Sequence, residues 1–246
     1  MDEVINFING KMLNFNEMTP EEIKAYDEEI ARKEHEQDLH EKTVRYRKSG
    51  VPERYFNETL DTYKITNEMQ ATAAKAATNF LHAAKCGEFK SLVMLGNAGT
   101  GKTHLSCALL RELGGVYRIA PDIVEEMRRA KSFTAAETEA EIINYYGRVK
   151  LLVIDEIGRG ISATDEKYVI YQLVNARYNT RKPTVLISNL GKSDFLQYIG
   201  VAAADRLVES AEICELKGES YRRELRAEGA KWLKETNSSF LFYKAD

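Results

Sequence analysis

Residues 96–103, with the sequence GNAGTGKT, constrain the fold of this 246-residue chain more than any other segment. They match the pattern G-x-x-x-x-G-K-[ST], which needs a strand before it and a helix after it. The apolar run 92–95 suits a buried strand, and apolar residues at helical spacing follow the motif. We therefore expect a strand, a glycine-rich turn and a helix in direct succession.

Such a turn directs successive backbone N–H groups, and the positive end of the new helix, toward phosphate oxygens. Lys102 is expected to reach the β- and γ-phosphates of a nucleotide, and the Thr103 hydroxyl is expected to bind Mg²⁺. The competing interpretation is a glycine-rich turn with a chance lysine, against which the strand–loop–helix setting argues. The predicted nucleotide-binding residues are Gly96, Asn97, Ala98, Gly99, Thr100, Gly101, Lys102, Thr103 and His104.

Two carboxylates end a second apolar run. Residues 151–154 suit a buried parallel strand, but packing does not explain Asp155 and Glu156 at its carboxyl end. Ligands of open α/β sheets bind at that edge. We expect Asp155 to hold Mg²⁺ through water and Glu156 to polarise the water that attacks the γ-phosphate. The alternative, two acids that merely open a loop, loses weight once a phosphate loop lies upstream.

A further apolar strand, 184–189, ends in a polar pair. Asn189 could hydrogen-bond the attacking water or the γ-phosphate, and a turn-forming asparagine before Leu190 is the alternative. The alternation of strands and helices predicts an α/β fold with a parallel sheet and helices on both faces. The expected strands are 92–95, 116–120, 151–156 and 184–189, and the expected helices are 68–84, 102–110, 121–130 and 165–182.

Residues 1–48 are expected to form a small helical module. Thr19, Pro20 and Glu22 compose a helix start with a capping box, and a charged run continues to about Lys48. Sparse apolar residues leave this helix only a narrow stripe to bury. It is either a solvated helix or linker, or a docking helix for a partner protein. The stretch 49–52, SGVP, marks a domain boundary.

Composition limits the class of protein. Hydrophobic residues make up 43% and charged residues 30%, which indicates a globular protein with a real core. No apolar run approaches the roughly 20 residues that span a bilayer, and no signal-peptide pattern opens the chain, so we expect a cytoplasmic protein without membrane contact. The three cysteines lack metal-ligand spacing, which favours reduced thiols over a zinc site. A net charge of −3 means that any nucleic-acid contact must come from a local patch or from several subunits together.

The motifs GNAGTGKT and LLVIDE, followed by a strand ending in SN, resemble those of AAA+ ATPases, and more closely the DnaC/IstB-like branch of helicase loaders and transposition helpers. The similarity extends over about residues 45–222 and includes the lead-in 46–56 and the IDEIG form at 154–158. It implies 1–48 as a helical partner-binding module, 49–66 as linker and lead-in, 67–223 as the ATPase domain, and 224–246 as a C-terminal helical tail. That tail is longer than in compact members of the branch.

The resemblance also implies roles for residues at the shared motifs. Asn189 would be the sensor-1 residue, and Arg206 would be the arginine finger that reaches the ATP of a neighbouring subunit. Arg222 would be the sensor-2 arginine, with Arg223 and Arg226 as close competitors. An arginine that crosses a subunit interface neutralises γ-phosphate charge only in the assembled state, so ATP would be coupled to self-association.

Members of this type load a ring helicase onto single-stranded DNA. The resemblance therefore implies an ATP hydrolase, slow as an isolated subunit, with ATP and Mg²⁺ as cofactors and a DnaB-type replicative helicase gripped by the N-terminal module. The branch often carries a DNA-contacting insertion at 125–133, where a solvated basic helix end with a core phenylalanine is the alternative. The candidate DNA-binding residues are Arg128, Arg129, Lys131 and Phe133.

Three other functions remain open at this point. An IstB-like helper of DNA transposition would share the same core motifs. A small-molecule kinase would need a mobile lid with arginines and an acceptor pocket, neither of which is visible in the sequence. An ATP-binding adaptor that hardly hydrolyses would not depend on Glu156.

Overall fold

A computed structural model describes residues 5–8, 11–14, 18–132, 134–160, 162–218 and 220–221, with backbone alone for 5–8 and 11–14. The chain divides into two compact units, Met1–Arg45 and Tyr46–Asp246. Phe133, Arg222, Arg223, Arg226 and the tail 224–246 lie outside the described residues.

The N-terminal unit contains a hairpin that the sequence had not indicated. Strands β1 (Ile5–Ile8) and β2 (Lys11–Asn14) pair antiparallel. Helix α1 (Pro20–Arg47) follows and begins with the expected capping box. The Glu22 amide donates to the Thr19 hydroxyl at 3.3 Å, and the Thr19 amide donates to the Glu22 carboxylate at 2.8 Å. These reciprocal bonds satisfy amide groups that a helix start leaves unpaired.

Solvated charges line most of helix α1. Ion pairs one helical turn apart recur along it, such as Lys33 with Glu29 at 2.7 Å and Lys42 with Asp38 at 2.5 Å. Tyr46, near its end, is its buried residue, whereas Leu39 and Val44 are exposed apolar side chains. The helix is therefore held mainly by local pairs, which each contribute only a few tenths of a kcal/mol.

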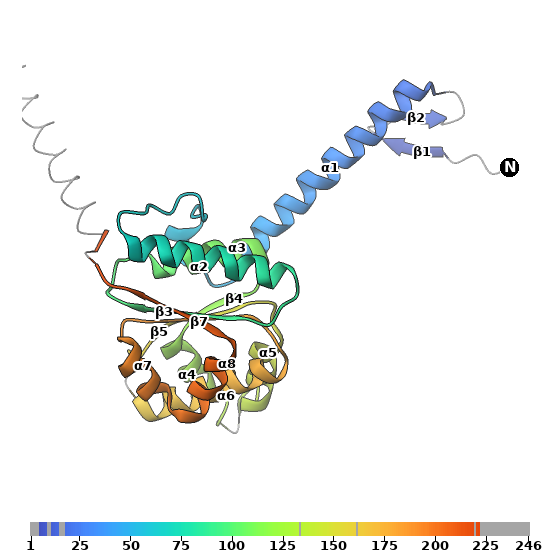
Figure 1. The fold of residues 1–246 in the computed structure, drawn as a ribbon. Coiled ribbons are helices and arrows are strands. Elements are labelled where there is room, and N and C mark those ends of the chain that lie inside the picture. The colour runs from blue at the N-terminus through green and yellow to red at the C-terminus, as the bar shows by residue number, and fades with distance from the viewer. Residues whose placement is uncertain are drawn as a thin grey trace, which may run out of the picture. The chain divides into compact units, whose positions relative to one another are not determined.

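The larger unit is built on a five-stranded parallel sheet with the order β4-β5-β6-β3-β7 (Figure 1). The edge strand β7 was not expected from the sequence, because charged residues interrupt its apolar pattern. The other four strands lie where the apolar runs predicted them. Their bounds are β3 (Ser91–Gly96), β4 (Val116–Ile119), β5 (Leu152–Ile157), β6 (Thr184–Ser188) and β7 (Ala211–Leu216).

Helices cover both faces of this sheet, so the expected α/β fold class is confirmed. Figure 1 shows α2 and α3 on one face and the remaining helices of the unit on the other. Helices α5, α7 and α8 are additions to the expected set. The bounds are α2 (Glu68–Lys85), α3 (Lys102–Leu113), α4 (Ala120–Arg129), α5 (Glu139–Arg148), α6 (Ala163–Asn179), α7 (Lys192–Ile199) and α8 (Val201–Ser210), with a 3₁₀ turn η2 at Glu53–Tyr55.

Alternating side chains of the strands feed two apolar clusters. Val93, Ile154 and Leu186 pack toward α4–α8, while Leu92 and Val153 pack toward α2 and α3. Burial on both faces explains why these strands read as continuous apolar runs. Within the part of the chain that is described, no helix combines the length and apolarity needed to cross a membrane.

Candidate nucleotide site

The loop between β3 and α3 has the backbone that its glycines predict. Gly96, Gly99 and Gly101 all have positive φ, at 106°, 83° and 94°. Gly101 is the N-cap of α3, so the first free amide groups of that helix face the loop. The Lys102 ammonium donates to the carbonyls of Gly96 and Asn97, both at 2.7 Å, and is folded onto the loop in this state.

Neighbouring segments pack closely on two of these glycines. A Cβ on Gly101 would lie 2.3 Å from the Tyr63 ring, and one on Gly99 would lie 1.9 Å from the Ser220 hydroxyl oxygen. The Tyr63 hydroxyl also donates to the Thr100 carbonyl at 3.0 Å. The loop is thus enclosed by a segment before the core and by one after β7.

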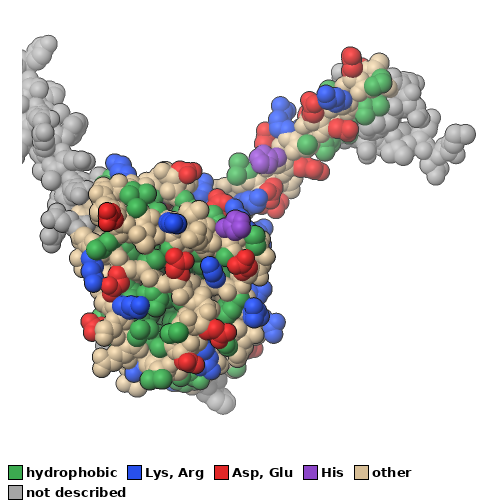
Figure 2. Space-filling view, viewed as in Figure 1, with side chains coloured by type: hydrophobic (Ala, Val, Ile, Leu, Met, Phe, Trp, Pro, Cys, Tyr) green, Lys and Arg blue, Asp and Glu red, His purple; other side chains and the backbone are tan. Residues whose placement is uncertain are grey.

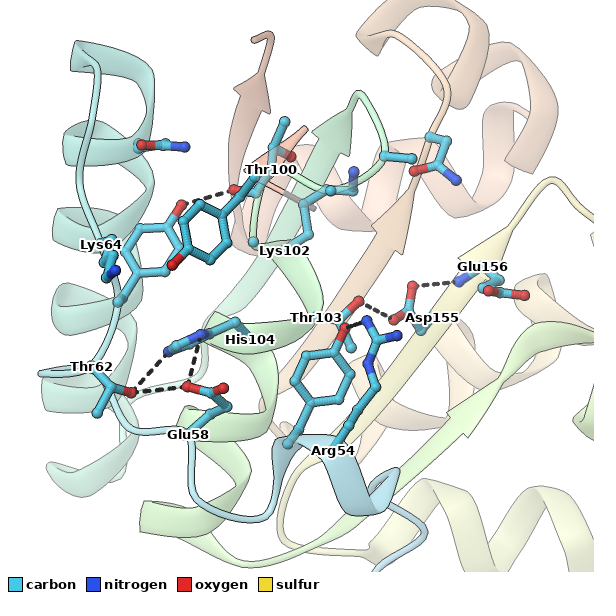
Figure 3. A pocket seen from close by; sticks show the side chains of 18 of the residues that line it. Arg54, Glu58, Thr62, Lys64, Thr100, Lys102, Thr103, His104, Asp155 and Glu156 are labelled. Atoms are coloured by element: carbon cyan, nitrogen blue, oxygen red, sulfur yellow. Dashed lines mark hydrogen bonds and ion pairs between the residues drawn. The ribbon is translucent and has the colours of Figure 1, made fainter. Parts of the chain in front are cut away.

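Asp155 lies at the end of β5 with three hydrogen-bond donors around it. The Thr103 and Tyr117 hydroxyls each donate to one carboxylate oxygen at 2.8 Å, and the Glu156 amide donates to the other at 2.6 Å (Figure 3). Burial and this carboxylate raise the pKa of Tyr117, so the phenol stays protonated and remains a donor. Asp155 is only 5% exposed, and its side chain has one fixed orientation.

Glu156 has φ of +59°, a left-handed conformation that is uncommon for a residue with a side chain. The pairing of β5 with β6 shifts register between Ile154 and Ile157, so Glu156 lies at an irregularity of the strand. Holding a non-glycine residue there costs about 1–3 kcal/mol, and such strain clusters at functional sites. The Glu156 side chain is 43% exposed and free to meet a ligand.

These groups share one cavity of about 580 Å³, which has Asn189 from the end of β6 on its wall. The structure therefore brings together most of the predicted nucleotide site. The predicted residues that line the cavity are Ala98, Gly99, Thr100, Gly101, Lys102, Thr103, His104, Asp155, Glu156 and Asn189.

Sequence reasoning missed a second wall of the cavity, formed by residues 53–64, which we call the strap. The lead-in pattern at 46–56 pointed to part of it, but nothing in the residue types marked it as lining a ligand site. Arg159, Gln70 and Tyr221 were missed as well. The strap residues on the wall are Arg54, Tyr55, Glu58, Thr62, Tyr63 and Lys64.

His104 ties the strap to the first turn of α3. Its Nδ1 lies 3.2 Å from the Glu58 carboxylate, and its Nε2 lies 2.8 Å from the Thr59 carbonyl and 3.3 Å from the Thr62 hydroxyl (Figure 3). Both ring nitrogens thus face strap oxygens. The side chain following the phosphate-loop threonine positions protein against protein at the edge of the cavity.

Arg206 does not line this cavity. It lies on α8, where its guanidinium donates to the Ala202 carbonyl at 2.8 Å and stacks 5.7 Å from the Tyr171 ring centroid and 5.9 Å from that of Tyr178. A contribution to ATP chemistry would therefore have to be made to another subunit's site.

Carboxylates pair with the described members of the candidate DNA-binding group. Arg128 meets Asp165 at 2.6 Å, Arg129 meets Glu125 at 3.0 Å, and Lys131 meets Glu139 at 3.3 Å. The Arg128 guanidinium lowers the pKa of Asp165. On the face of the core unit in Figure 2, blue and red side chains are interspersed.

The donor set near Asp155 fits Mg²⁺ better than it fits a transition metal. A hydroxyl and a carboxylate, Thr103 and Asp155, supply the hard oxygen atoms that Mg²⁺ prefers, and few protein ligands suffice because Mg²⁺ keeps several waters and binds phosphates. Their 2.8 Å separation allows both to reach one ion or its water shell.

Comparison with known proteins matches residues 27–229 to the family of IstB-like ATP binding proteins. The replicative helicase loader DnaC of Buchnera aphidicola subsp. Schizaphis graminum is 29% identical over 191 residues, covering 74% of this chain and 76% of that protein. A putative ATP-binding protein of insertion sequence IS232 from Bacillus thuringiensis subsp. berliner is 29% identical over 143 residues, covering 54% and 56%.

A crystal structure of the DnaC helicase loader superposes with a TM-score of 0.59 at 23% identity, covering 68% of this chain and all of that one. This likeness supports the P-loop fold. Together with the phosphate loop, the paired acids and a family match spanning most of the sequence, it leads to one assignment. The chain belongs to the IstB-like ATP-binding family, within the DnaC/IstB-like branch of the AAA+ ATPases.

Proposed function

We propose that this protein is an ATP-dependent loader of a replicative DNA helicase onto single-stranded DNA, with ATP binding and hydrolysis as its assembly switch. The observation that carries the proposal is the convergence of Lys102, Thr103, Asp155 and Glu156 on one cavity, in a chain whose relatives are named helicase loaders. Binding and water activation need these groups on one sheet edge.

Each of these residues has a role in the proposed reaction. Lys102 leaves the loop carbonyls and binds the β- and γ-phosphates, while Thr103 and Asp155 hold Mg²⁺, which neutralises phosphate charge when bound. Glu156 polarises the attacking water, and Asn189 hydrogen-bonds that water or the γ-phosphate. The amides of residues 96–101 cradle the phosphates, and His104 keeps the strap against the site.

The proposed assembly makes each ATP a contact between subunits. Arg206, remote from its own cavity, supplies positive charge to the γ-phosphate held by a neighbour. Arg222, outside the described residues, is the proposed sensor-2 arginine of the subunit that binds the ATP. Hydrolysis by an isolated subunit is then slow.

The proposed helicase contact is the N-terminal module. Exposed Leu39 and Val44 on α1 give a partner apolar surface among charges. The proposed DNA contact is made by Arg128, Arg129 and Lys131, with Phe133 outside the described residues. Phosphates would have to replace the carboxylates that now pair with the three basic side chains, so binding is expected to depend on several subunits together.

A direct test mixes the protein with a DnaB-type hexameric helicase of its host and measures complex mass by light scattering, with and without ATP. The expected result is a complex that forms with the full chain and is lost from a Leu39→Asp, Val44→Asp variant. Retained ATP binding by that variant would show that its core is intact. No complex under any nucleotide condition would rule out the loader function.

The second candidate is a helper of DNA transposition, favoured by the insertion-sequence relative. The nucleotide chemistry would be the same, so the partner must decide. Binding of a transposase in the same mass measurement, with no binding of the helicase, would favour the helper. A neighbouring transposase gene would point the same way.

A further inference from the structure

Arg159 belongs to the nucleotide cavity, although no motif drew attention to it. Its amide donates to the Glu156 carbonyl at 3.2 Å and closes a turn at the end of β5. Glu156 and Gly158 both have positive φ in this turn, at 59° and 91°. The reversal returns Arg159 to the side of Glu156, with 4.0 Å between the guanidinium and the carboxylate.

A buried carboxylate holds the backbone on both sides of Arg159. Glu166, in the first turn of α6, is fully buried and accepts the Gly158 amide at 2.5 Å and the Gly160 amide at 2.8 Å. A Cβ on Gly160 would lie 2.2 Å from a Glu166 oxygen, so the fit needs glycine there. Burying a carboxylate is costly without donors, and the two amides supply them. The turn is therefore held from beneath by an acid that never meets the cavity.

The surrounding residues define which end of the nucleotide Arg159 faces. Thr103 and Asp155 mark the Mg²⁺ and the β- and γ-phosphates, and Glu156 works on the water at the γ-phosphate. Because Arg159 lies beside Glu156, it lies on the γ-phosphate side of the cavity. A guanidinium there meets a phosphate in ATP that is absent in ADP.

We propose that Arg159 contacts the γ-phosphate of ATP bound in its own subunit and makes the site prefer ATP to ADP, and that Glu166 is the residue that positions it. This inference rests on the proposed ATPase function and adds a second arginine to it. Arg206 would act between subunits, whereas Arg159 acts within one. In the nucleotide-free state Glu156 partly neutralises Arg159, and the γ-phosphate competes for the same guanidinium.

The test measures Mg²⁺-dependent affinity for a non-hydrolysable ATP analogue and for ADP by calorimetry, at a protein concentration where subunits stay separate. Arg159→Ala is expected to weaken the ATP analogue about tenfold and to change ADP by less than about twofold, as for loss of one charge-assisted bond. Arg159→Lys should fall between Arg159→Ala and the wild type. Arg148→Ala removes an exposed arginine far from the cavity and should change neither affinity.

Glu166→Gln tests the positioning role. It keeps the shape but turns one acceptor into an NH₂ group that opposes a backbone amide, so the ATP preference should fall as in Arg159→Ala. Combining both changes should cost no more than Arg159→Ala alone, because the two residues act as one unit. A variant that loses its cooperative thermal transition leaves the decision to Arg159→Ala and Arg159→Lys, whose side chain is exposed.

The outcomes separate the inference from the function beneath it. If the wild type binds both nucleotides and Arg159→Ala weakens both equally, or neither, Arg159 does not read the γ-phosphate and the inference is wrong. If the wild type binds no nucleotide, the proposed ATPase function fails with it.

Discussion

The Thr103 hydroxyl donates a 2.8 Å hydrogen bond to the Asp155 carboxylate, although the two residues are 52 positions apart. This bond joins the first turn after the phosphate loop to the end of β5. It aligns the hydroxyl and the carboxylate that are proposed to serve one Mg²⁺. Several consequences of this arrangement can be measured.

Thr103→Val should abolish most of the gain in ATP affinity that Mg²⁺ provides, by about tenfold or more, because the isosteric side chain has no hydroxyl. Thr103→Ser keeps the hydroxyl and should retain the gain. Calorimetry with ATP analogue, with Mg²⁺ or with chelator, measures the difference. Equal Mg²⁺ dependence in both variants would contradict the proposed role of Thr103.

Glu156→Gln should slow hydrolysis by about 10²–10⁴-fold while ATP still binds, since the amide cannot accept a proton from water. Arg206→Ala should leave ATP binding by the isolated subunit unchanged, because Arg206 is remote from its own cavity. Both variants should be inactive as assemblies.

A mixture of these two variants should recover activity. One subunit supplies Glu156 and its neighbour supplies Arg206, and random mixing at a head-to-tail junction unites the intact pair in about one junction of four. Phosphate release from the equimolar mixture is the measurement. A mixture as inactive as its components would show that Arg206 does not act across an interface.

Gly101→Ala should destabilise the protein by about 2–4 kcal/mol, because left-handed backbone strain adds to a clash with the Tyr63 ring. Gly87→Ala is the matched control, since its φ of +78° is also positive but nothing lies within 4 Å of its Cβ. It should cost only the strain, about 1–2 kcal/mol. Urea unfolding of the two variants measures both values.

Stability should fall in alkaline solution through Cys214, whose burial raises its thiol pKa from 9.0 to about 11. The folded state favours the neutral thiol, so this contribution is complete below the unfolded pKa and is lost as pH rises toward 11. Cys214→Ala should therefore lose less unfolding free energy between those pH values. Cys86→Ala, at an exposed thiol, should follow the wild type.

Single-stranded DNA binding should weaken in a double variant with Arg129→Ala and Lys131→Ala. Its log–log dependence on salt should also become shallower, by about one for the two lost phosphate contacts. Fluorescence anisotropy with a labelled oligonucleotide, in the presence of ATP analogue, measures both effects. Arg148→Ala serves as the control, and an unchanged slope in the double variant would place the DNA contact elsewhere.

The sequence alone determined those features that depend on local spacing. Apolar runs located four of the strands, and the glycines of residues 96–101 predicted a backbone with positive φ. Thr19 and Glu22 likewise predicted their own capping box, because both partners lie within one helical turn. The α/β class followed from the order of strands and helices.

The sequence did not determine where the second wall of the cavity comes from. The strap reaches the phosphate loop through Tyr63 and His104, whose contacts depend on how α3 and the lead-in pack. Strand β7 escaped notice because charged residues break its apolar run, although it completes the sheet beside β3. The N-terminal hairpin likewise carried no recognised turn signal.

Local sequence thus determined which residues can bind phosphate and activate water, because that chemistry requires particular groups at fixed spacing. Only the tertiary structure decided which distant groups join them. Asp155 meets Thr103 because parallel strands bring their carboxyl ends to one edge. Glu166 fixes the turn at Arg159 because α6 packs beneath that edge, and a contact between separate elements leaves no periodic trace along the chain.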